Sequence, residues 1–63
     1  MWEGTIDGKH AVAFVNDTEV AQTFSLPNEA GMPNGGVEIL QGAGKLQGDV
    51  VLEPHDAMLI VEG

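Results

Sequence analysis

Glycine and proline are spread so evenly along this chain that long helices are excluded. The 63 residues include nine glycines and three prolines, and every window of twelve residues contains one of them except in the stretch between Gly8 and Pro27. Both residues weaken a helix interior, glycine through backbone entropy and proline through its missing N–H. Even the long stretch alternates in the manner of a strand. The pattern therefore predicts an all-β fold of short strands.

The alternation between turn-forming clusters predicts about seven strands in one antiparallel, Greek-key-like β-sandwich that occupies residues 1–63 as a single domain. Asp7-Gly8 supplies the positive φ angles of a tight hairpin turn. Residues 27–36 are rich in Pro, Asn and Gly and are expected to form an irregular loop. Residues 37–61 are typical of a β-meander that closes the module. The expected strands are 2–6, 10–16, 20–26, 37–40, a short step at 46, 50–52 and 57–62.

Apolar residues occupy both faces of the strand at 10–15, which indicates a central strand. Val12 and Phe14 lie on one face, and Ala11, Ala13 and Val15 lie on the other. We expect the second face to be a docking surface for another protein. The expected core comprises Val12, Phe14, Val20, Phe24, Leu26, Ile39, Leu52, Met58 and Ile60.

The charge balance argues against two classes of partner. Ten acidic residues against Lys9 and Lys45 give a formal charge of −8, which repels nucleic-acid phosphates and anionic lipid headgroups. The apolar run at residues 57–61 is far shorter than the ~20 residues that span a bilayer, and no basic-then-apolar leader opens the chain. We therefore expect no nucleic acid and no membrane as partners, and a soluble protein, with the cytoplasm as the favoured compartment. The sequence Met1-Trp2 indicates a domain excised from a longer protein.

A domain of this size buries only about 60% of the surface of its unfolded chain, so its stability is thin. The chain has no cysteine to form a disulfide. His10 and His55 are its only soft metal ligands, which argues against a structural zinc site. We therefore expect no metal and no cofactor, and a fold held by packing within the chain or against a partner.

Three phrases of the sequence resemble the small C-terminal β-domain of glycoside hydrolases, especially the family 42 β-galactosidases and also the α-amylase family. They are Phe14-Val15-Asn16-Asp17-Thr18-Glu19, Val37-Glu38-Ile39-Leu40-Gln41-Gly42, and the run from Val50 to Val61 with Glu53-Pro54-His55-Asp56 at its hinge. The chain departs from the family pattern at Gln41, Glu53 and His55. The resemblance covers residues 10–62 and implies an appendage that packs on a catalytic (β/α)₈ barrel, with the catalytic carboxylates located in that barrel.

Trp2 is the best candidate for a ligand contact, because sugar rings stack on exposed aromatic side chains. Only Phe14 and Phe24 accompany it, and both are expected in the core. We therefore favour packing in the core or an interface as the role of Trp2. Asn16-Asp17-Thr18 matches the N-glycosylation pattern and is equally typical of a turn between strands.

No catalytic constellation emerges from the other polar residues. Glu53 and Asp56 flank a solvated turn, where no burial raises the pKa of either carboxyl as glycoside hydrolysis would require. His10 and His55 lack a nucleophile to activate. The sequence Gly42-Ala43-Gly44-Lys45 is not followed by a helix start, so it does not read as a phosphate-binding loop.

With these features, the resemblance implies a non-catalytic domain of a glycoside hydrolase that packs against its catalytic barrel or another protein surface. The alternative is a small carbohydrate- or protein-binding module that uses Trp2 and the loop at 27–36. A third interpretation is a mini-domain that self-associates through a sheet edge as a homo-oligomer.

Overall fold

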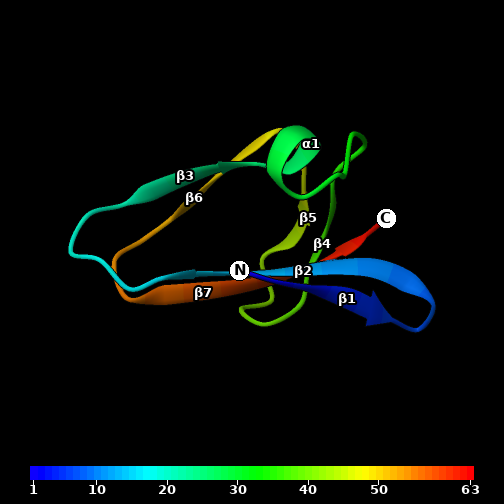
Figure 1. Cartoon of the computed structure of the whole chain (residues 1–63), viewed down its shortest axis with the longest axis horizontal. Helices are drawn as coiled ribbons and strands as arrows, with labels where there is room; N and C mark the ends of the chain where they lie inside the picture. The colour runs from blue at the N-terminus through cyan, green and yellow to red at the C-terminus, as the bar shows by residue number, and fades with distance from the viewer.

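Seven antiparallel strands and one helical turn make up the protein in the computed structural model, which describes all 63 residues (Figure 1). The elements are β1 (Trp2–Ile6), β2 (Lys9–Asn16), β3 (Gln22–Ser25), α1 (Leu26–Glu29), β4 (Gly36–Glu38), β5 (Gly44–Leu46), β6 (Asp49–Leu52) and β7 (Asp56–Glu62). A five-stranded sheet has the order β1-β2-β7-β4-β5, and β3 pairs with β6 in a second sheet. The predicted all-β antiparallel fold is confirmed. The Greek key and the full sandwich are not confirmed, because the second sheet has only two strands.

The hairpin of β1 and β2 forms as its turn sequence predicts. Asp7 and Gly8 both have positive φ, at 53° and 76°, which matches the right-handed twist of the flanking strands. Ile6 lies opposite Lys9 and Trp2 lies opposite Ala13. The expected boundaries of these two strands are therefore confirmed to within one residue.

The last third of the chain is not a β-meander, so that prediction was wrong. β7 inserts between β2 and β4, while β6 leaves the large sheet and pairs with β3. Pro54 ends β6, as expected of a residue that cannot donate to a ladder. His55 follows with a φ of 57°. The turn at these two residues therefore carries the chain from one sheet to the other.

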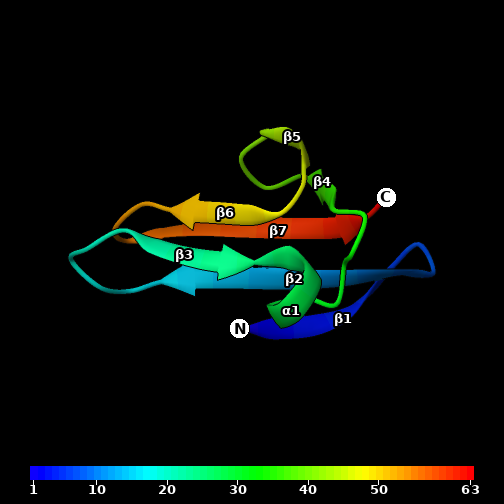
Figure 2. The ribbon, with the colours of Figure 1, turned by 90° about the horizontal axis from the view of Figure 1, so that it is seen from above.

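The β3–β6 ribbon lies over one face of β2 and β7, and the core fills the space between them (Figure 2). Phe14 of β2 stacks on Phe24 of β3 with ring centroids 4.4 Å apart, a favourable offset arrangement. The buried cluster contains Val12, Phe14, Leu26, Ala30, Met32, Val50, Leu52 and Ile60, with Phe24, Leu46 and Met58 packed against it. Most of the predicted core is thus confirmed.

Two predicted core residues are exposed instead, Val20 to 62% and Ile39 to 49%. Val20 lies in the loop before β3, where its carbonyl accepts a hydrogen bond from the Asn16 side chain. At β4 the predicted register was wrong by one residue, because Glu38 takes the inward position. A shift of one residue turns every side chain of a strand to the other face.

The loop predicted at 27–36 contains α1 and two core residues. The Ser25 hydroxyl caps α1 by accepting from the N–H of Asn28, and a proline occupies the first turn, both ordinary signals of a helix start. Met32, expected to be isolated, is fully buried together with Ala30. The segment therefore covers one end of the core. No helix of the protein has the length and apolar character needed to cross a bilayer.

Candidate functional site

The face of the five-stranded sheet that points away from the β3–β6 ribbon is called the outer face here. The strand registers place on it twelve residues: Trp2, Gly4, Ile6, Lys9, Ala11, Ala13, Val15, Val37, Lys45, Ala57, Leu59 and Val61. Ile39 extends this surface beyond β4, where its N–H donates to the Leu59 carbonyl. Ala11 is fully buried on this face, and Ala13, Ala57, Leu59 and Val61 are partly buried.

The outer face is apolar and accessible. Val15 is 62% exposed, Trp2 and Ile39 are 49% exposed, and Val37 is 40% exposed. Both lysines of the protein occupy strand positions on this face, whereas none of its ten acidic residues does. Asp7 and Glu62 lie at its rim. In a chain with a formal charge of −8, such segregation sets this surface apart from the rest of the molecule.

Trp2 lies flat on the outer face. A Cβ atom added at Gly4 would stand 2.5 Å from Cζ2 of the Trp2 indole, far inside van der Waals contact. The ring can therefore rest across β1 only because Gly4 has no side chain. One edge of the indole stays accessible, so Trp2 belongs to an exposed surface and not to the core.

One end of the outer face is hollowed into a concavity of about 260 Å³. Ile6, Val37, Ile39 and Val61 provide its apolar lining. Asp7, Lys9, Glu62 and Gly63 complete the wall. The hollow is large enough for an apolar side chain of a partner, and its charged residues carry both signs.

The structure does not bring Trp2 and the segment 27–36 together. Trp2 belongs to the outer face, whereas Leu26, Ala30 and Met32 pack into the core on the opposite face of the sheet. A single ligand therefore cannot contact both while the sheet stays intact. The binding site expected from these two features combined is not assembled.

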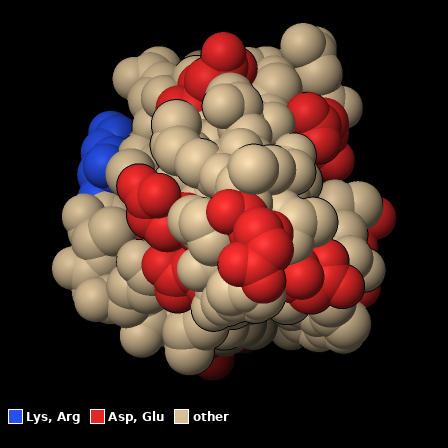
Figure 3. Space-filling model, turned by 90° about the vertical axis from the view of Figure 1, so that its left-hand side faces the viewer, with Lys and Arg blue, Asp and Glu red and all other residues tan.

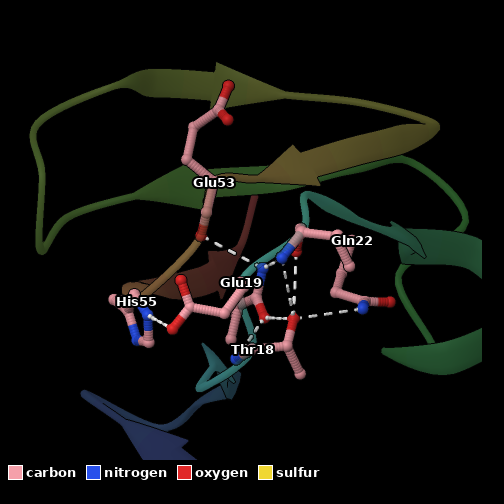
Figure 4. A network of polar contacts seen from close by, with 7 residues as sticks. Thr18, Glu19, Gln22, Glu53 and His55 are labelled. Carbon is pink, nitrogen blue, oxygen red and sulfur yellow. Dashed lines mark hydrogen bonds and ion pairs between the residues drawn. The ribbon is translucent and has the colours of Figure 1, made fainter.

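Asn16 joins the β2–β3 loop to the end of β6. Figure 4 shows this region of polar contacts, with Thr18, Gln22 and Glu53 labelled. Only 2% of Asn16 is exposed, and its Nδ2 donates to the carbonyls of Val20, Leu52 and Glu53 at 2.8–3.1 Å. Its Oδ1 accepts from the backbone N–H and the hydroxyl of Thr18. Every polar atom of the side chain is thus occupied, and a glycan on Nδ2 is incompatible with this fold.

Glu38 is a second buried polar anchor, one that the sequence reading missed. Its carboxylate is 1% exposed and accepts from the N–H groups of Leu40, Gln41, Ala43 and Leu59 at 2.9–3.2 Å. Burial alone raises the pKa of this carboxyl, but the four backbone donors outweigh burial and lower the pKa below its usual 4.5. The glycine-rich loop after β4 therefore cradles an anion, which is a carboxylate of the chain itself.

Two pairs of ionisable side chains form at the surface. His10 Nε2 lies 2.6 Å from Glu3 Oε2, and His55 Nε2 lies 3.0 Å from Glu19 Oε1. The two histidines thus contact different acids, and nowhere do three His, Asp or Glu side chains gather in a way that could hold a metal ion.

Acidic side chains gather at the end of the molecule formed by the β2–β3 loop and the β6–β7 turn (Figure 3). Glu53 is exposed there, while Asp56 accepts a hydrogen bond from the N–H of Ala57. No cleft lies between these two carboxyl groups, since the one concavity of the protein is elsewhere.

The three phrases that resemble glycoside hydrolase β-domains meet in space. Asn16 of the first phrase bonds to the carbonyls of Leu52 and Glu53 in the third. Glu38 of the second phrase accepts from Leu59 of the third. These residues fix the path of the backbone. No family model, curated protein or solved structure matches this chain.

Proposed function

We propose that this protein is a non-catalytic accessory domain that packs through its outer face against another folded domain. The observation that carries the proposal is a partly exposed apolar sheet face whose strand positions hold both lysines, with acids only at the rim of its hollow, in a strongly acidic chain. Contiguous exposed apolar surface of this kind marks interaction sites more often than free surface.

The composition of the outer face suits contact with a protein. Depletion of acids, an exposed tryptophan and aliphatic side chains are typical of the centre of an interface. Lys9 and Lys45 can bury their methylene stems while their ammonium groups reach the rim. Neither lysine has an ion-pair partner within the chain. A partner that is apolar at its centre and acidic at its edge would complement this surface.

The polar groups that could have been catalytic are used for structure. Asn16 and Glu38 are buried and fully hydrogen-bonded to the backbone. Neither is free to bind or activate a substrate. This supports a structural role over an enzymatic one.

Within this proposal, the catalytic barrel of a glycoside hydrolase is the partner suggested by the sequence resemblance. The support for this partner is the order of the three phrases in the sequence. The substrate and the reaction would belong to that barrel. The alternative is a small carbohydrate- or protein-binding module, which now depends on Trp2 without the segment 27–36.

The first test is binding of this chain to a family 42 β-galactosidase barrel from which the C-terminal β-domain has been removed. We expect a complex in sedimentation velocity and a raised melting temperature of the barrel. Val37→Asp should weaken the complex, since it places a buried charge in the interface. Val51→Asp is the matched control, because Val51 is 54% exposed on β6, away from the outer face.

A titration of Trp2 fluorescence with galactosides and glucans separates the two functions. A docking domain should show no saturable change, whereas a sugar-binding module should show one. Saturable quenching by a sugar, together with failure to bind the barrel, would replace the docking proposal with the alternative.

A further inference from the structure

β1 leaves one of its edges unpaired along its whole length. It pairs with β2 on one side only and forms the margin of the five-stranded sheet. Its five residues make it the longest free edge, since β3 and β6 have four residues and β5 has three. Proteins usually protect such edges with proline, charged side chains or a bulge. β1 has no proline and no bulge, and its one charged side chain, Glu3, lies 2.6 Å from His10 Nε2.

The hairpin turn determines which backbone groups face the open edge. In a two-residue hairpin the residues that flank the turn, Ile6 and Lys9, exchange both hydrogen bonds. Bonded pairs then recur at every second residue, so Gly4 and Trp2 also bond to β2. The N–H and C=O groups of Glu3 and Thr5 therefore point outward without partners.

A second copy of β1 can pair with this edge antiparallel about a two-fold axis at Glu3, Gly4 or Thr5. An axis at Glu3 sets Glu3 against Glu3 of the partner subunit. An axis at Thr5 sets Glu3 against Asp7 of the partner subunit. Both arrangements oppose like charges, which destabilises a cross-strand pair.

The axis at Gly4 has no such conflict. Glu3 then lies opposite Thr5 of the partner subunit, and each pair exchanges two backbone hydrogen bonds through the groups that point outward. Trp2 lies opposite Ile6 of the partner subunit on the outer face, which is a favourable aromatic–aliphatic pair. Gly4 meets its own copy at the axis, where the absence of side chains permits close approach.

We propose that the protein forms a symmetric dimer through β1, in which two five-stranded sheets join into one continuous sheet about an axis at Gly4. The interface is isologous, as in most homodimers. The dimer uses the edge of the sheet and leaves the outer face accessible. It is therefore a separate proposal from the docking function, and each can be tested without the other.

Sedimentation equilibrium over a range of concentrations tests the dimer directly. We expect a mass that rises from 6.6 kDa to twice that value. Added salt should favour the dimer by screening the repulsion between two acidic chains. Thr5→Pro should abolish association, since it removes an outward donor while leaving the bonds between β1 and β2 intact.

Charge substitutions at Thr5 test the register. Thr5→Lys places two lysines opposite the two Glu3 residues and should tighten the dimer roughly two- to thirtyfold. Thr5→Glu should weaken it by a similar factor. Thr23→Lys is the matched control, because it changes the charge equally on exposed β3. Circular dichroism of each variant confirms that the monomer stays folded.

Three results would overturn the proposal. A mass of 6.6 kDa at every concentration up to millimolar excludes the dimer. Association that survives Thr5→Pro assigns the contact to another surface, such as the outer face. Weakening by both Thr5→Lys and Thr5→Glu moves the axis from Gly4 to Thr5.

Discussion

At the scale of single residues, the polar side chains that matter most in this protein are those that water cannot reach. Asn16 joins the loop after β2 to the turn after β6 through three carbonyl groups. Leaving buried acceptors without a donor costs more than the bond itself contributes. The side-chain amide of Asn16 therefore contributes to the stability of the isolated chain.

Replacing Asn16 by Ala should lower the free energy of unfolding by about 1–3 kcal/mol, because the carbonyls of Leu52 and Glu53 lose their donor. Urea unfolding followed by circular dichroism measures this loss. Asp17→Ala is the control, since the neighbouring side chain is exposed and makes no hydrogen bond within the chain. Equal stability of the two variants would show that the hydrogen bonds of Asn16 do not stabilise the fold.

Glu38 should make the stability depend on pH in a defined direction. Because its pKa is lowered in the folded state, its stabilising contribution is fully present above the unfolded pKa, near 4.5, and is lost as the pH falls through the folded-state value. Glu38→Gln should cost about 1–3 kcal/mol near neutral pH, with a smaller difference from the parent protein near pH 3. Urea midpoints at both pH values test this, and a constant difference would contradict it.

The structural roles of Asn16 and Glu38 could not be predicted from the sequence. Asn16 was read as a turn former with a glycosylation pattern, because nothing local shows that its amide reaches carbonyls 36 and 37 residues away. Glu38 was overlooked because an acid inside a short apolar run normally faces solvent. The one sequence signal was the glycine turn that follows Glu38, because such a turn can direct backbone N–H groups toward its carboxylate.

At the scale of elements, glycine determines how closely β4 approaches β7. A Cβ atom at Gly36 would lie 2.5 Å from the Val61 carbonyl oxygen and 2.7 Å from Cγ2 of Ile60. The first neighbour is backbone, which cannot move without disturbing the sheet. Gly36 is therefore required by the packing of the two strands.

Gly36→Ala should destabilise the protein by about 1–3 kcal/mol, the range observed for overpacked interiors. Gly42→Ala provides a comparison in open space, because no atom lies within 4 Å of its added Cβ. Its φ of 76° makes the substitution cost only about 1 kcal/mol. Thermal unfolding of both variants distinguishes packing from backbone strain, and a larger loss at Gly42 would refute the packing argument.

The elements themselves were largely predictable, and their partners were not. Asp7-Gly8, Pro54 and the apolar alternation locate strands because turn chemistry and side-chain period are local properties. The pairing of β6 with β3 is not local, since it depends on which faces can be buried together. The helical turn α1 was missed, although Ser25 and Pro27 carry the usual signals of a helix start.

At the scale of the whole molecule, the large sheet has one face in the core and one face open. Val12 and Val15 lie on the same strand but on opposite faces, with exposures of 0% and 62%. Substitutions at these positions should therefore differ sharply in the isolated chain. The same contrast tests whether the outer face is free of cover in solution.

Val12→Thr should cost about 1–3 kcal/mol, because it buries a hydroxyl group without a partner. Val15→Thr should change the free energy of unfolding by no more than about 0.5 kcal/mol. Urea unfolding at low protein concentration gives both values. A comparable loss for Val15→Thr would mean that the outer face is covered, either by a second copy or by chain rearrangement.

The apolar outer face was expected from the two apolar faces of the strand at 10–15, but its charge was not. Lys9 and Lys45 are 36 positions apart in the sequence, and only the registers through β2, β7 and β4 place both on one surface. The composition alone predicts an acidic protein and says nothing about how its charges are distributed over the surface. The segregation of charge emerges only when the strands are ordered.

The position of β7 between β2 and β4 also bears on synthesis in the cell. β7 follows the other six strands in the sequence, so the part of the sheet that emerges from the ribosome first lacks the strand that joins β2 to β4. The apolar side chains of the β1–β2 hairpin therefore remain exposed until β7 emerges from the exit tunnel. Translation speed and chaperone access during that interval would decide how much of the newly made protein reaches its native form.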